Sequence, residues 1–502
     1  MKSNYAVLLI AIPLLVAFLQ PLFSLINKRL TKWVTFLTIG FNFIYSLKLL
    51  NYVMANGAQI AIIGNWKPPF GINLYLSPFS MLFATIIYFV ALIVLLVYLI
   101  DKPTEVDDRM SIATLLMVMA SGAITLTGDI FNMFVFVEIL SISTVILISF
   151  NNKGISFKGA FRYIVLASLG SSMLLLAIGF IYGSLGTLNL ASIAYRFNLL
   201  NPVYASVIVF LFMAGIMVEA ELFPFNAWVP EAYKGSKSYL NALLSGVVGT
   251  TGIYVLFRMF ITIFGSGQNH IQVIGSVNFN AVIIVIGVLT TLIGEFSALS
   301  QKDIKKILAF SSMAQMGIIA VTIGVANMNS INAGIFHLIN HAFSKSLLFI
   351  VAFPIINIVG SANIDKWEGL GRKNIFLAIA FAIGSFGLIG IPFFNGFWSK
   401  MMIVESVVSA GGWMYLVIGT ILLSALVETF YFFRIIFKLF VDKKIESTYS
   451  VHIFIYLAIL ILSIIVIYIG IKPSFLATYI HKAAIDLVDK SHYISTVLGV
   501  IK

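Results

Sequence analysis

Three titratable side chains recur every four residues in the segment IFHLINHAFSKSLLF, namely His337, His341 and Lys345. On a helix this spacing places them on one face, in a stripe about 12 Å long. Histidine titrates near neutral pH, so such a stripe has the chemistry of a proton relay. A pair of hydrogen-bonded core histidines is the plainer alternative. Zinc is disfavoured, because no Glu follows the first His as in the H-E-x-x-H motif.

Two acids, Glu219 and Glu221, enter an apolar run just before a Pro-Phe-Asn interruption at Pro224. Two residues apart on a regular helix, their side chains point about 200° away from each other, so they cannot share one partner. Where a helix breaks, backbone carbonyls become free, and a carboxylate beside them favours a cation site. The alternative is that one of the two acids is a local cap or a paired structural acid.

Glu138 and Lys400 are two further charges in apolar surroundings. Glu138 lies in FNMFVFVEILSISTVIL, so its partner must come from another helix, and its protonation should depend on that partner. A permanently ion-paired structural acid is the alternative. Lys400 follows GIPFFNGFWS, whose Pro and Gly residues loosen a helix. A buried lysine can load and release a proton, whereas a lysine near a helix end snorkels to the membrane interface.

The composition explains why these charges are informative. The chain has 502 residues, of which 60% are hydrophobic and only 10% charged, and its mean hydropathy is +1.05. About a quarter of the residues in a soluble protein are charged, so the composition indicates a polytopic membrane protein. An ionisable group at the bilayer centre costs roughly 2.5–3.5 kcal/mol. Glu295 and Glu428 also fall in apolar segments, and the whole set is read most economically as an axis that carries protons or cations.

Apolar segments of about 20 residues predict an all-α fold with about fourteen transmembrane helices. They lie near residues 5–27, 32–54, 76–100, 110–128, 130–150, 160–183, 203–223, 239–264, 279–300, 304–326, 330–359, 375–393, 412–440 and 451–471. The seventh and the twelfth contain the interruptions FPFNAWVP and IPFFNGFW. Paired broken helices in two halves are typical of inverted-repeat transporters, and chance similarity between Phe-rich segments is the alternative. Residues 184–202 and the tail after Lys472 predict amphipathic interfacial helices.

The net charge of +12 does not indicate nucleic acid as a partner, because the basic residues collect on one side of the predicted membrane. About two thirds of the 31 Lys and Arg residues fall there. That side should be cytoplasmic. An even number of spans then places both termini on the extracytoplasmic side of the cell (inner or plasma) membrane. The chain has no Cys, which excludes disulfides, thiolate metal sites and a cysteine-ligated iron–sulfur cluster.

Several stretches, in one order along the chain, together resemble the antiporter-like subunits shared by respiratory complex I, Mrp-type Na+/H+ antiporters and membrane-bound hydrogenase-like complexes, most of all the MrpD-like branch. They are VEILSIS, FPFNAWVPEAY, NALLSGVVGTTGIYVLFR, SQKDIKKILAFSSMAQMG, HLINHAFSKSLLF and GIPFFNGFWSK. The resemblance implies fourteen helices, with helices seven and twelve broken and two inverted five-helix repeats. On that basis residues 1–109 form helices one to three, 110–264 the first repeat, 279–440 the second, and 441–502 helix fourteen with the tail.

The resemblance also implies a chain of Glu, Lys and His residues, joined by water, at the membrane midplane. Glu138 matches the family's fifth-helix glutamate, which normally pairs with a lysine on helix seven. The motif on helix eleven is matched by His337, His341 and Lys345. Lys400 matches the lysine of helix twelve near the outer end of the pathway.

The sequence departs from this pattern in the first half. Glu219 stands where the family has the helix-seven lysine, Thr250 where helix eight has lysine or histidine, and Asn226 where PFHxWLP has histidine. Glu138 has therefore lost its expected partner. Because two facing carboxylates repel, a bound Na+ or a lysine of a neighbouring subunit could take the place of that partner.

The expected function is that of a proton- or cation-translocating subunit of a multisubunit complex. That complex would be a Mrp-type antiporter or a Mrp-related redox-driven ion pump, linked to ferredoxin, quinone or hydrogen. Other membrane subunits are then its partners, and H+ and Na+ its candidate ions. Two alternatives are a structural subunit that only braces a respiratory complex and an independent transporter of an organic solute. No nucleotide-binding loop or redox ligand set occurs in the sequence, so we expect no cofactor and no catalytic redox module in this chain.

Overall fold

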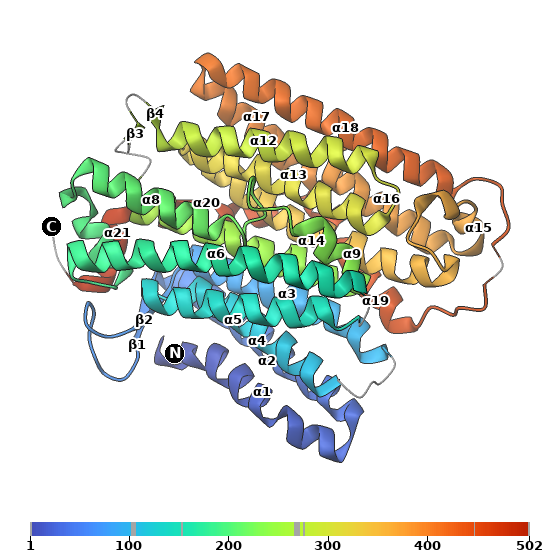
Figure 1. The fold of residues 1–502 in the computed structure, drawn as a ribbon, viewed down its shortest axis with the longest axis horizontal. Coiled ribbons are helices and arrows are strands. Elements are labelled where there is room, and N and C mark those ends of the chain that lie inside the picture. The colour runs from blue at the N-terminus through green and yellow to red at the C-terminus, as the bar shows by residue number, and fades with distance from the viewer. Residues whose placement is uncertain are drawn as a thin grey trace.

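A computed structural model describes residues 3–101, 107–151, 154–265, 272–274, 277–445 and 447–499. Long helices run side by side along the longest axis of the molecule (Figure 1). Within the described residues, 12 helices are long and apolar enough to cross a membrane, and two shorter apolar helices accompany them, Pro202–Ile216 and Ile375–Ile389. The prediction of an all-α polytopic protein with about fourteen spans is confirmed.

The elements follow the predicted order closely. The helices of the first half are α1 (Leu8–Ile26), α2 (Lys28–Asn56), α3 (Pro78–Ile100), α4 (Asp107–Leu126), α5 (Ile130–Ser149), α6 (Gly154–Leu185), α7 (Leu190–Arg196), α8 (Pro202–Ile216), α9 (Val229–Gly235), α10 (Ser238–Leu243) and α11 (Thr250–Phe257). Two π-helical segments, η3 (Leu244–Gly249) and η4 (Arg258–Ile263), continue α10 and α11 as one rod. Short 3-10 turns are η1 (Ser3–Val7) and η2 (Phe197–Leu199).

The second half contains the remaining helices. They are α12 (Phe279–Ser300), α13 (Ile304–Val325), α14 (Met328–Val359), α15 (Leu370–Lys373), α16 (Ile375–Ile389), α17 (Asn395–Ala410), α18 (Tyr415–Leu439), α19 (Ile453–Ile471), α20 (Ser474–Val488) and α21 (Lys490–Leu498), with the 3-10 turns η5 (Ile364–Lys366) and η6 (Gly412–Met414). Two antiparallel hairpins, which the sequence did not predict, pair β1 (Gln59–Ile62) with β2 (Asn73–Leu76) and β3 (Gln272–Ile274) with β4 (Val277–Asn278).

Both predicted breaks are present. The chain leaves helical geometry after α8 and resumes it at α9, and it does so again between α16 and α17. Each break contains a non-glycine residue in the left-handed region, Glu221 with φ 57° and Phe393 with φ 73°. Such a backbone is uncommon outside glycine and ends a regular helix. These residues keep the chain from resuming the helix directly after Ile216 and Ile389, where α8 and α16 end, the latter with the left-handed Gly390 as its C-cap, and the predicted spans 203–223 and 375–393 were too long at their C-terminal ends.

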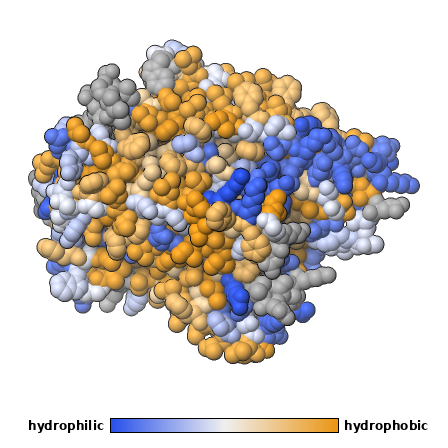
Figure 2. All heavy atoms as spheres, in the orientation of Figure 1, coloured by the Kyte–Doolittle hydropathy of each residue, from blue (hydrophilic) through white to orange (hydrophobic). Residues whose placement is uncertain are grey.

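The two ends of the bundle differ. The chain termini, the β1–β2 hairpin and α21 lie at one end, and α15 lies at the other (Figure 1). Figure 2 shows hydrophobic residues over the middle of the visible face, with hydrophilic residues gathered at the end near α15. At that hydrophilic end, Asp365 accepts hydrogen bonds from Lys438 and Lys302, which lower its pKa to about 2. An apolar waist between polar ends is what a membrane protein presents to a bilayer.

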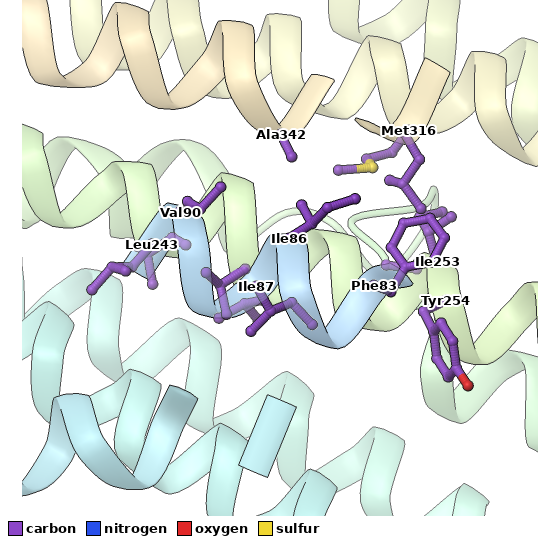
Figure 3. Close-up of a cluster of buried hydrophobic side chains, with 14 of the residues drawn as sticks. Phe83, Ile86, Ile87, Val90, Leu243, Ile253, Tyr254, Met316 and Ala342 are labelled. Carbon is purple, nitrogen blue, oxygen red and sulfur yellow. The ribbon is translucent and has the colours of Figure 1, made fainter. Parts of the chain in front are cut away.

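The rod formed by α10, η3, α11 and η4 lies at the centre of the molecule, and its most apolar stretch is entirely buried. Figure 3 shows apolar side chains of α3, such as Phe83 and Ile86, together with Ile253 of α11 and Met316 of α13. Packing against the first break is tight, because a Cβ at Gly252 would lie 2.5 Å from the backbone nitrogen of Ala220. The rod thus holds the first broken helix in place.

The tail after Lys472 forms the predicted amphipathic helices, but α20 does more than lie at an interface. It packs against α3 and α14 and buries Asp486. The stretch 184–202, which predicted an interfacial helix, contains the short helix α7 and the turn η2.

Candidate functional site

The predicted stripe on α14 is present and faces α13. His337, His341 and Lys345 are all at most 2% exposed. Lys345 donates from Nζ to the Ser311 hydroxyl at 2.6 Å and to the carbonyl of Leu308 at 3.2 Å. It forms no ion pair with any described carboxylate. The acids that interact with it electrostatically come from both halves of the chain, and they are Glu221, Glu295 and Glu428.

His341 lies between the central rod and α13. Its Nε2 is 3.3 Å from the Ser312 hydroxyl and 3.5 Å from that of Ser245 on η3. Its Nδ1 is buried and has no hydrogen-bond partner among the described residues. Buried polar atoms in proteins usually have a partner, but no described neighbour fixes the protonation of this nitrogen.

His337 begins a second run of contacts that leads to Lys400. Its Nε2 is 2.8 Å from Oε1 of Gln315 on α13, and the Gln315 amide donates to Oε1 of Glu428 on α18 at 3.0 Å. The other oxygen of Glu428 accepts a hydrogen bond from Lys400 on α17 at 2.8 Å. Lys400 is 8% exposed and Glu428 fully buried, so Lys400 is a member of a buried ion pair and not a snorkelling lysine.

Another buried acid, Glu295 on α12, lies beside this pair. Ser424 of α18 donates to its Oε1 at 2.8 Å, while its Oε2 has no hydrogen-bond partner within the described structure. Ser424 is one helical turn from Glu428, and the two carboxyl groups interact electrostatically. Two acids and Lys400 therefore share one buried cluster.

Glu221 connects the first break to the stripe. Its two carboxylate oxygens accept hydrogen bonds from the Tyr233 hydroxyl at 2.6 Å and from Ser312 at 2.9 Å. Since Ser312 also lies beside His341, one hydroxyl group links the acid of the broken helix to the histidine of α14.

Glu219 faces elsewhere, although the two acids lie beyond the end of α8 and not on the regular helix for which their opposite orientation was argued. Tyr163 of α6 approaches both of its oxygens, at 2.8 and 2.9 Å, and Ser141 of α5 donates to one of them at 2.9 Å. No described lysine or arginine forms an ion pair with it.

Glu138 does not occupy the buried apolar site that was expected. It is half-buried, and in the described chain it has no hydrogen bond or ion pair, although it interacts electrostatically with Glu219. The reason is its place on α5, since Phe131, Val135 and Ile142 on the same stripe of the helix are all exposed. Glu138 therefore lies on the outer surface of this chain.

The sequence of this chain matches the model of a known protein family. The family model described as NADH:quinone oxidoreductase/Mrp antiporter, TM, matches residues 127–426. The chain belongs to this family. Among curated relatives, a putative antiporter subunit mnhD2 of Staphylococcus aureus (strain MRSA252) is 30% identical over 447 residues, which cover 88% of this chain and 87% of the relative. The mnhD2 subunit of Staphylococcus epidermidis (strain ATCC 12228 / FDA PCI 1200) is 29% identical over 446 residues, with 88% and 86% covered.

Solved structures agree with the family assignment. A chain of the membrane-bound sulfane sulfur reductase, an archaeal respiratory membrane complex, superposes with a TM-score of 0.91 at 33% identity, over 99% of this chain and 100% of that one. A chain of the Mrp complex from Dietzia sp. DQ12-45-1b gives a TM-score of 0.88 at 22% identity, over 99% and 100%, which shows the fold. The predicted resemblance to antiporter-like subunits is confirmed.

The departures from the antiporter-subunit pattern have visible structural consequences. The Asn226 amide donates to the backbone carbonyl of Glu221 at 3.2 Å and so stabilises the break. The hydroxyl of Thr250 is buried and has no described hydrogen-bond partner. No basic side chain replaces the missing ones, because the described residues place no lysine or histidine on α8, α10 or α11. Nor do they contain a cluster of three or more His, Asp or Glu side chains that could hold a metal ion.

The main omissions of the sequence analysis are neutral residues. Ser312 and Gln315 carry no charge, and SSMAQ contributed to the sequence analysis only as part of a stretch that resembles the family. Glu428 was noted as an intramembrane acid, but its partners Gln315 and Lys400 are distant in the sequence, so its place in the run could not be predicted.

Proposed function

We propose that this chain is a proton-translocating subunit of a multisubunit membrane complex of the Mrp antiporter or sulfane sulfur reductase type. One observation carries the proposal, a run of buried titratable groups from the first broken helix to the second. It passes from Glu221 through Ser312 to His341, along the α14 stripe on which Lys345 and His337 each lie one turn from His341, and from His337 through Gln315 and Glu428 to Lys400. Burying so many ionisable groups at membrane depth is costly, and proton transfer gives them a common role.

Lys345 is the central carrier in this proposal. Its hydrogen-bond partners are a hydroxyl and a carbonyl, both neutral, so no carboxylate fixes its charge. A buried lysine without a direct counter-ion loses its proton readily. Lys345 interacts electrostatically with acids of both halves. In this proposal, its charge therefore depends on the protonation of the acids in one half and affects that of the acids in the other.

Replacing Lys345 by methionine should abolish proton transport, because the side chain keeps its length and loses its only titratable group. The measurement is acidification of liposomes that contain the whole purified complex, followed with a trapped pH-sensitive dye. Lys482→Met is the matched control, because this exposed lysine only donates to the carbonyl of Met54. Unchanged acidification by a fully assembled Lys345→Met complex would exclude proton transfer through this chain.

The first half, in our proposal, handles Na+. Glu138 and Glu219 interact as like charges, and the groups bonded to Glu219 are hydroxyls. Hydroxyl oxygens can turn to ligate a cation, and hard oxygen ligands suit Na+ as they suit other hard cations. Because Glu138 is half-buried on the outer face of α5, a lysine of a neighbouring subunit is the other cation that could compensate it.

Glu219→Gln tests the sodium proposal. The variant is isosteric and removes one negative charge, so proton transport should lose its dependence on Na+ while transport by the second half continues. The measurement is the rate of proton movement in the same liposomes as a function of Na+ concentration. Glu405→Gln, a change of an exposed acid on α17, is the control. A sodium dependence that survives in Glu219→Gln would refute a sodium site at this acid.

A second candidate function is structural bracing of the complex. The observation that favours it is the loss of basic residues from the first half, where Glu219 and Thr250 stand. It predicts that Lys345→Met and Glu219→Gln both leave ion movement unchanged. In either function we place the chain in the cell membrane, with both termini, which lie at the same end of the bundle, on the extracytoplasmic side.

A further inference from the structure

One link in the run between the stripe and Lys400 is an amide. We infer that the Gln315 side chain is a gate, which blocks proton transfer between His337 and the Glu428–Lys400 pair until it moves. The inference rests on the proposed proton transport and adds to it the point at which transport is controlled.

The hydrogen bonds fix which way the amide points. Oε1 of Glu428 accepts a hydrogen bond from Gln315 at 3.0 Å, so the Gln315 atom facing Glu428 is its NH₂ group. The carbonyl oxygen therefore faces Nε2 of His337, at 2.8 Å. A carbonyl can only accept, so His337 must carry a hydrogen on Nε2, and Nδ1 is left as its basic nitrogen.

An amide in this position joins two groups without conducting protons between them. To pass a proton on, Gln315 would have to gain one on its carbonyl oxygen and lose one from its nitrogen, which leaves an imidic acid that must then revert. A hydroxyl or carboxyl group has no such difficulty, because it can receive a proton on one lone pair and release another. A proton that reaches Nδ1 of His337 is therefore stopped before Glu428.

The neighbour of Nδ1 suggests what opens the gate. Ser399 of α17 lies 2.9 Å from Nδ1 and 3.1 Å from the carbonyl of Gly396, and its oxygen also accepts from Asn340. Its single hydroxyl hydrogen can go either to the Gly396 carbonyl or, while His337 is neutral, to Nδ1. When His337 is protonated, Nδ1 becomes a donor and the hydroxyl must turn to Gly396.

Protonation of His337 thus changes the hydrogen bonds in the first turn of α17, directly after the second break. Lys400 is the next residue on this helix, and its ammonium holds the carboxylate to which Gln315 donates. A shift of this turn moves Lys400 and Glu428 relative to Gln315. Once the amide leaves Glu428, water or the imidazole itself can reach the carboxylate.

Gln315→Glu tests the gate. A carboxyl group of nearly the same shape can accept a proton from His337 on one oxygen and release one to Glu428 from the other. We expect the complex in liposomes, with an imposed pH gradient and no driving reaction or Na+, to leak protons roughly tenfold faster or more than the unchanged complex, since a positioned acid–base group accelerates proton transfer by at least that much. Gln20→Glu is the matched control, because Gln20 is another buried amide, bonded to Thr35 of α2 and remote in sequence from the run.

Gln315→Met provides a second test if the acidic variant does not assemble. It keeps the volume of the side chain and removes both hydrogen bonds, so the protonation state of His337 no longer reaches Glu428. We expect its coupled transport to fall at least tenfold without a leak. Two results would overturn the gate. One is transport at the wild-type rate by Gln315→Met. The other is an assembled Gln315→Glu complex that leaks protons no faster than the Gln20→Glu complex.

The outcomes also separate the gate from the proposed function. If Lys345→Met stops transport and Gln315→Glu does not leak, proton transport stands and the gate is wrong. If Lys345→Met transports normally, the chain does not carry protons and the gate is wrong with it.

Discussion

Lys400→Met should stop coupled proton transport and also destabilise the bundle. The Lys400 ammonium donates to Glu428 at 2.8 Å and to the carbonyl of Ile389 at 3.2 Å, in a site that is nearly closed to solvent. Removing one partner of a buried ion pair leaves the other charge uncompensated, which costs about 3–5 kcal/mol in soluble proteins. The methionine also removes the last titratable base of the run, so protons can no longer leave it through α17.

The double variant Lys400→Met with Glu428→Gln separates these two effects. With both charges removed, no buried charge is left alone, and replacing a whole buried pair is often close to neutral for stability. We therefore expect thermal stability in detergent, followed by intrinsic fluorescence, to recover most of the loss, while transport remains absent. Lys443→Met is the control, since its pair with Glu368 is largely exposed and such pairs contribute at most about 1 kcal/mol. Coupled transport by the single variant at the wild-type rate would contradict the prediction.

The sequence was sufficient to predict the helices and the positions of most charges, because hydropathy and helical period act locally. Fourteen apolar segments, two breaks and the His337–His341–Lys345 stripe all followed from patterns within short windows. The contacts that connect the charged residues to one another could not be predicted from such short windows. Gln315 and Glu428 lie 113 residues apart in the chain, and nothing local in SSMAQ distinguishes the amide that bridges two titratable groups from one that caps a turn.

Glu138 illustrates a different limit. An acid in an apolar run predicts a buried partner, but the same run suits a helix whose face is covered by lipid or by another subunit. The exposed neighbours Phe131 and Ile142 show that this face of α5 points away from the chain. Hydropathy cannot distinguish contact with the chain's own core from contact with another apolar surface.

The two breaks are alike in sequence and different in use. In the first, Glu221 supplies a carboxylate to Ser312 and Asn226 holds the backbone. In the second, Asn395 bonds to Ser344 and Asn340 on α14, so that break is anchored on the helix that carries the stripe. The first break thus contributes an ionisable group, whereas the second is bonded to α14 just before Lys400, which is where the proposed gate requires it.

Asp486→Ala should have the largest effect on stability outside the run. Asp486 of α20 receives hydrogen bonds from Arg258 at 2.8 Å, from Tyr75 at 2.9 Å and from Ser77 at 2.6 Å. Arg258 also stacks over the rings of Tyr75, Phe79 and Tyr493. Without the carboxylate, a buried guanidinium is left unpaired, which costs about 3–5 kcal/mol. Because Asp486 ties α20 to the end of the central rod, we expect the C-terminal helices to detach first.

Limited proteolysis detects that detachment as early cleavage between α19 and α21, and thermal unfolding in detergent gives its magnitude. Asp489→Asn is the matched control, since this exposed residue only caps α21 by accepting from the His492 amide at 2.8 Å and asparagine caps equally well. The double variant Arg258→Met with Asp486→Leu removes both charges. It should restore much of the stability, because no unpaired guanidinium is left. Equal protease resistance of Asp486→Ala and Asp489→Asn would show that the ion pair does not hold the C-terminal helices. Their attachment would then depend on apolar packing against α3 and α14 alone.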